Sequence, residues 1–93
     1  MIAFNKQSVQ KKQIKLLPQE TEGNYTFTGN FVSTPAAIEK FGHEIIVAAH
    51  IILMRKAKQT GGLDYLQVFE VDGQRLWFID DESHVTALLP SDY

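Results

Sequence analysis

The stretch YLQVFEVDGQRLWFIDD, residues 65–81, indicates two β-strands joined at Asp72-Gly73. Asp-Gly is among the strongest two-residue hairpin signals, because a type I′ turn needs positive φ at both central positions. The register that follows pairs these residues on one face: Leu66 with Ile79, Val68 with Trp77, and Glu70 with Arg75. On the other face it pairs Gln67 with Phe78, Phe69 with Leu76, and Val71 with Gln74, and sets Tyr65 opposite Asp80. A slip of one residue would exchange the two faces.

Both faces of this hairpin carry large apolar side chains. If a helix covers one face, the other face needs a different partner to be buried. The face without polar interruptions is predicted to pack against a helix: Leu66, Val68, Trp77 and Ile79. The other face is interrupted by Gln67 and Asp80 and is therefore predicted to be an interaction surface. That surface comprises Phe69, Val71, Leu76, Phe78 and Gln67, together with His50 from the preceding segment.

The preceding segment has the start and stop signals of one long helix, over about residues 34–59. Thr34 suits the N-cap and Pro35 the first helical position, while Gly61-Gly62 supplies the stop. Many of its residues are β-branched, which favours a buried strand as the competing interpretation. Length and the end signals decide for helix. Gly42 inside it predicts a kink or a close packing contact.

The remaining elements complete an α+β domain of the order β-β-α-β-β-β, an antiparallel sheet with one long helix across one face. Residues 11–18 and 25–33 are predicted to form a first hairpin, with a bulge or bend at Gly29-Asn30. Residues 84–90 form a last strand that ends at Pro90. With 93 residues the chain is expected to be a single domain, in which residues 1–10 are a flexible or edge segment.

Composition narrows the environment of the protein. There is no cysteine, and the longest apolar run, residues 45–54, is too short to span a bilayer. No leader-like segment opens the sequence. We therefore expect a cytoplasmic protein that makes no use of a membrane. Its size and simplicity are typical of small accessory proteins of bacteria and phages.

Charge is unevenly distributed along the chain, whose net charge is −2. Four lysines and no acid fall within the first nineteen residues: Lys6, Lys11, Lys12 and Lys15. Such a basic segment either keeps an edge strand soluble or follows a phosphate backbone. Aromatic residues on a sheet could then stack with bases, the candidates being Tyr65, Phe69, Trp77 and Phe78. Binding of single-stranded nucleic acid is thus the alternative function, which the net charge disfavours.

Catalytic patterns are missing from the sequence, so no catalytic residue, metal site or cofactor is predicted. His43 and His50 lie two helical turns apart, about 10 Å, which is too far to chelate one metal ion. His50 is expected to be a satisfied interior histidine or a pH-sensitive interface residue. Asp80 and Asp81 would point to opposite faces of a strand, so an acidic turn is favoured over a cation site.

The sequence therefore predicts a small non-enzymatic protein-interaction or regulatory accessory protein. Its hairpin has an apolar surface and its helix is apolar nearly all round, so both are expected to be covered by another protein chain. Two-fold dimers are the commonest solution. A homodimer or another protein partner is the expectation, and the sequence resembles no family that would name one.

Overall fold

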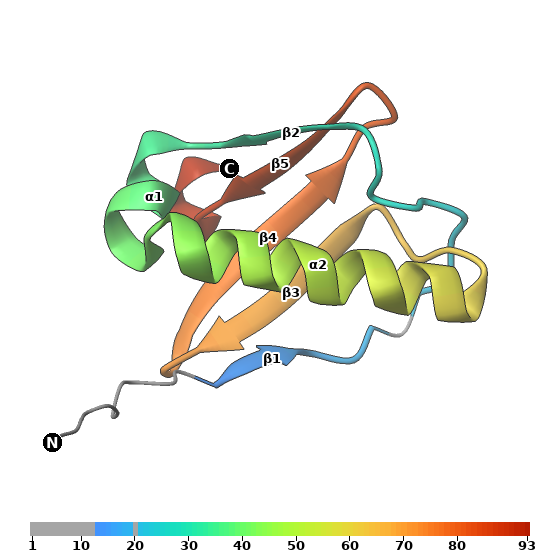
Figure 1. Cartoon of the computed structure of the whole chain (residues 1–93), viewed down its shortest axis with the longest axis horizontal. Coiled ribbons are helices and arrows are strands. Elements are labelled where there is room, and N and C mark those ends of the chain that lie inside the picture. The colour runs from blue at the N-terminus through green and yellow to red at the C-terminus, as the bar shows by residue number, and fades with distance from the viewer. Residues whose placement is uncertain (1–12, 20) are drawn as a thin grey trace, which may run out of the picture.

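A computed structural model describes residues 13–19 and 21–93. Its strands are β1 (Ile14–Leu16), β2 (Asn30–Ser33), β3 (Leu66–Val71), β4 (Gln74–Asp80) and β5 (His84–Leu88). Helices α1 (Pro35–Phe41) and α2 (His43–Thr60) follow β2, and a short 3-10 helix, η2 (Pro90–Asp92), follows β5. The strands form one sheet in the order β1-β3-β4-β5-β2, and α2 lies across one of its faces (Figure 1). The predicted α+β class is confirmed.

The β3–β4 hairpin has the register that its turn predicts. All six cross-strand pairs from Leu66–Ile79 to Val71–Gln74 are present. Asp72 and Gly73 both have positive φ, at 54° and 77°, as a type I′ turn requires. β5 continues the sheet antiparallel to β4.

The predicted first hairpin is wrong. β1 pairs antiparallel with β3 at one edge of the sheet, whereas β2 pairs parallel with β5 at the opposite edge. Residues 17–19 and 21–29 lie between the two edges, and Figure 1 shows them passing around the end of the sheet. It is anchored on the way by a bridge between Tyr25 and Leu63. The sheet is therefore mostly antiparallel, with one parallel pair.

The predicted long helix is two helices that meet at Gly42. This glycine has φ 85° and ψ 155°, so it ends α1 and begins α2. A side chain at this position would meet nothing within 4 Å, so the glycine serves the change of direction and not a close contact. Thr34 caps α1 through its hydroxyl, which accepts from the Ala37 N–H at 3.1 Å, and Pro35 opens it as predicted.

The inner face of the sheet, which packs against the helices, is the reverse of the predicted one. Strands β3 and β4 alternate in burial, and the buried positions are Gln67, Phe69, Val71, Leu76, Phe78 and Asp80. They join Ile46, Ala49 and Leu53 of α2 in the core. The predicted interaction residues Phe69, Val71, Leu76 and Phe78 are thus core residues with no free surface, and Leu66, Val68, Trp77 and Ile79 face away from the helices.

The reversal has a physical cause in two polar residues. Asp80 is buried because its carboxylate accepts from the backbone N–H groups of Phe27 (2.9 Å) and Glu82 (2.8 Å). Gln67 is only 1% exposed, and its amide donates to the carbonyl of Asp64 at 3.1 Å. Polar groups that find such partners can be buried. The polarity of Asp80 and Gln67 therefore does not identify the solvent-facing side of the hairpin.

Candidate functional site

The outer face of the sheet, opposite the helices, carries an apolar patch. We define the outer-face patch as Val32, Leu66, Val68, Trp77 and Ile79. Cross-strand pairing places Leu66 beside Ile79 and Val68 beside Trp77, and Thr86 connects Ile79 to Val32. Val32 is 44% exposed and the others are half-buried, and neither α1 nor α2 covers them. Contiguous apolar surface of this kind is typical of an interaction site.

Charged residues adjoin the patch where the hairpin turns. Register places Lys15 of β1, Glu70 of β3 and Arg75 of β4 side by side on the outer face. A cation therefore flanks Glu70 on each side. A row with both signs can meet either an acidic or a basic partner, including a second copy of itself.

The C-terminal residues shield one corner of the outer face. The Tyr93 ring meets the Trp77 ring edge-on, with centroids 5.6 Å apart, and Leu88 beside Trp77 is buried. The η2 helix is held by Asp92, whose carboxylate accepts from the Leu89 N–H and from the Thr34 hydroxyl. These hydrogen bonds, the one from Leu89 first, lower the pKa of Asp92 below its usual value of 3.8.

His50 is the one predicted interaction residue from the helix, and the structure places it in the core. Its Nε2 atom lies 2.9 Å from the Phe27 carbonyl oxygen, and its ring stacks on Phe31 with centroids 4.2 Å apart. It is a satisfied interior histidine, the first of the two predicted alternatives. Phe27 is fully buried with φ 60°, a conformation that bulky residues rarely adopt. His50 and Asp80 hold its peptide groups from two sides.

In the acidic turn after β4, the carboxylate of Asp81 accepts hydrogen bonds from the backbone. Asp81 accepts from the backbone N–H groups of His84 (2.7 Å) and Ser83 (3.0 Å), and these bonds lower its pKa from 3.8. Asp80 points inward and Asp81 outward. Within residues 13–19 and 21–93, no three His, Asp or Glu side chains lie close enough together to hold a metal ion.

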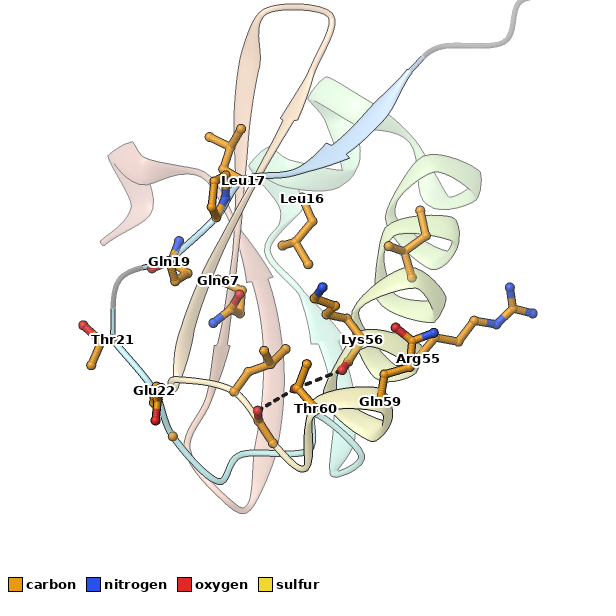
Figure 2. A pocket seen from close by; sticks show the side chains of 15 residues that line it. Leu16, Leu17, Gln19, Thr21, Glu22, Arg55, Lys56, Gln59, Thr60 and Gln67 are labelled. Atoms are coloured by element: carbon orange, nitrogen blue, oxygen red, sulfur yellow. Dashed lines mark hydrogen bonds between the residues drawn. The ribbon is translucent and has the colours of Figure 1, made fainter.

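A groove of about 900 Å³ lies on the helix side of the molecule, between the C-terminal half of α2, the segment of β1 and its continuation (residues 16–19 and 21–23), and Gln67 of β3. Figure 2 shows Leu16 pointing into it while Leu17 points away. The Lys56 amine is turned toward Leu16 and Gln67, whereas the Arg55 side chain extends away from the groove. No sequence pattern had indicated this groove, because its walls come from three separate segments.

The described residues that were predicted for nucleic-acid binding are divided between the core and the surface of the domain. Lys6, Lys11 and Lys12, like the predicted segment 1–10, lie outside the described residues, and Lys15 belongs to the charged row of the outer face. Phe69 and Phe78 are buried, so bases cannot stack on them. Trp77 and Tyr93 are the aromatic pair that the outer face retains.

Comparisons with known proteins assign no relative. No protein-family model matches the chain, and neither a curated protein nor a solved structure is significantly similar to it. In the part of the chain that the structure describes, no helix has the length and apolar character needed to cross a membrane.

Proposed function

We propose that this protein is a small non-enzymatic interaction domain that self-associates through its outer-face patch. The observation that carries the proposal is the position of Trp77, the only tryptophan of the chain. It lies among Val68, Leu88 and Tyr93 on the sheet face that α1 and α2 leave open. Tryptophan is enriched among residues that dominate binding energy at interfaces.

A second copy of the chain is the occupant that the charge pattern supports. A two-fold axis parallel to the strands, midway between β3 and β4, would set Val68 against Trp77 of the second copy. The same axis would set Glu70 against Arg75 of the second copy, and Arg75 against its Glu70. Neighbouring opposite charges are self-complementary under such an axis. Two sheets packed face to face in this way form a dry layer about 10 Å thick.

Sedimentation of a matched pair of variants tests this proposal. Val68→Arg places a charge within the patch, and Val47→Arg places the same charge on the exposed side of α2, where Val47 is 45% exposed. We expect the wild type and Val47→Arg to exceed the 10.5 kDa monomer mass as concentration rises. Val68→Arg should stay monomeric, because burying an unpaired charge is costly.

Two results would contradict the proposal. Association of a folded Val68→Arg protein equal to that of the wild type would exclude the outer-face patch. Loss of association in Val47→Arg alone would move the interface to the exposed side of α2. Circular dichroism of both variants shows whether each has retained its fold.

Single-stranded nucleic acid is the alternative ligand, through Trp77 and Tyr93 next to Arg75. Base stacking on exposed aromatics and contacts of cations with phosphates would have to supply the affinity. Glu70 and the net charge of −2 oppose it. Fluorescence polarisation with a labelled oligothymidine at low salt separates the two functions. The self-association proposal predicts no change in polarisation, whereas a salt-sensitive rise would favour the alternative.

A further inference from the structure

The groove on the helix side is lined in part by a buried amide, the side chain of Gln67. Gln67 is 1% exposed, and its amide nitrogen donates to the Asp64 carbonyl. Its Oε1 atom has no hydrogen-bond partner among the described residues. Buried side-chain oxygens almost always accept a hydrogen bond, so this atom calls for a donor supplied from the groove.

A cation and an aliphatic wall accompany this acceptor. Figure 2 shows the Lys56 amine directed across the groove toward Gln67. Leu16, Ile52 and Leu63 contribute apolar lining. The Thr60 hydroxyl next to them is already engaged, since it donates to the carbonyls of Lys56 and Gly62. A ligand therefore has to bring an anion for Lys56, a donor for Gln67 and an aliphatic group.

We propose that this groove binds a short extended peptide in which an acidic residue adjoins an aliphatic one. A peptide backbone offers an N–H donor at every residue, its carboxylate would pair with Lys56, and its aliphatic side chain would pack on Leu63 and Leu16. Of the described lining cations, Lys56 is the one that Figure 2 shows turned into the groove, since the Arg55 side chain extends away from it. The charge of Lys56 favours an acidic ligand group beside it.

The length of the groove sets the length of the peptide. Its helical wall runs from Ile52 to Thr60, a rise of about 12 Å at 1.5 Å per residue. An extended chain advances about 3.3 Å per residue, so roughly four residues lie along this wall. The site is separate from the outer-face patch, and the inference does not depend on self-association.

Selection from a displayed library of random hexapeptides tests the inference. We expect peptides that bind the wild type to share an Asp or Glu next to Leu, Ile or Val. A synthetic peptide of that consensus should bind Lys56→Glu at least about tenfold more weakly, since a charge-assisted contact becomes a repulsion. Lys58→Glu is the matched control, because Lys58 is exposed on α2 outside the groove, and its affinity should stay within about twofold.

A second variant tests the buried acceptor. Gln67→Met keeps the length of the side chain and removes the amide, so a thermally stable Gln67→Met protein should bind the peptide several-fold more weakly. Failure of the library to yield an acidic–aliphatic consensus would overturn the inference, as would equal binding of the selected peptide to Lys56→Glu and the wild type. If Gln67→Met does not fold, the Lys56 comparison decides. Sedimentation of Lys56→Glu should match the wild type, which keeps this test distinct from that of self-association.

Discussion

The imidazole Nε2 atom of His50 lies 2.9 Å from the carbonyl oxygen of Phe27, and this contact ties α2 to the segment that crosses between the sheet edges. Asp80 of β4 accepts from the N–H of the same Phe27. A helix and a strand thus hold one buried residue whose positive φ of 60° is otherwise unfavourable. This arrangement fixes which face of the hairpin turns toward the helices.

Replacement of His50 should therefore destabilise the fold. His50→Phe retains an aromatic ring against Phe31 but leaves the Phe27 carbonyl buried without a donor, which costs about 1–3 kcal/mol. Urea unfolding measures this change in the free energy of unfolding. His43→Phe, an exposed position on the same helix, is the control and should change it by less than about 0.5 kcal/mol. Equal stability of His50→Phe and the wild type would show that the contact contributes nothing.

Two glycines with positive φ should respond differently to alanine. At Gly73, φ is 77° and a Cβ would meet nothing within 4 Å, so Gly73→Ala should cost only about 1–2 kcal/mol of backbone strain. At Gly62, φ is 122° and a Cβ would lie 2.6 Å from the Asn24 Cα. Gly62→Ala should cost about 3 kcal/mol or more, because the crossing segment must shift as well. Thermal or urea unfolding compares the two, and equal costs would contradict the close approach of the chain at Asn24.

Stability should decrease in acid partly through Asp92. Its pKa is depressed in the folded state, so its contribution is fully present above the unfolded value of 3.8. Below that value the unfolded chain takes up the proton first, and the contribution disappears as pH falls through the folded pKa. We expect urea unfolding between pH 5 and 2.5 to show a shallower decline for Asp92→Asn than for the wild type. Glu39→Gln, which alters an exposed carboxylate on α1, is the control; a slope for Asp92→Asn equal to that of the wild type would exclude this role.

Charge reversal tests the orientation proposed for the dimer. Glu70→Arg and Arg75→Glu each place like charges opposite one another across the proposed two-fold axis, so each variant alone should self-associate more weakly. An equimolar mixture should form heterodimers, because the two cations of one chain then face the two acids of the other. Sedimentation of the separate and mixed proteins measures this, and the effect should fade with salt. A mixture that associates no better than its components would exclude the proposed axis.

Local signals explain which parts of the fold were predictable. The Asp72-Gly73 turn specifies its own register, and Pro35 and Gly61 mark helix ends, because each acts through backbone conformation at its own position. The β1–β2 hairpin was predicted wrongly because residues 19–24 contain no two-residue turn signal that specifies a register. β2 instead finds β5, which lies more than 50 residues further along the chain.

The outer face was misassigned for a non-local reason. Because Asp80 and Gln67 are polar, the sequence predicted that their face of the hairpin meets solvent. The hydrogen-bond partner that allows Asp80 to be buried, the N–H of Phe27, is 53 residues away in sequence. The sequence showed that one face of the hairpin carries the apolar residues Leu66, Val68, Trp77 and Ile79. It did not show that this face points away from the helices. The groove at Lys56 and Gln67 had no sequence signal, because it exists only once α2, β1 and β3 are assembled.

Trp77 fluorescence tests the central proposal most directly, since the chain has no other tryptophan and this one lies in the outer-face patch. Wild-type protein is diluted from high micromolar to nanomolar concentration while the emission maximum and acrylamide quenching are recorded. Self-association through the patch predicts a shift of the emission to longer wavelength and stronger quenching on dilution, over the range in which sedimentation shows the mass falling to 10.5 kDa. Emission and quenching that stay constant while the mass falls would contradict an interface at Trp77, and a mass of 10.5 kDa at every concentration would contradict self-association itself.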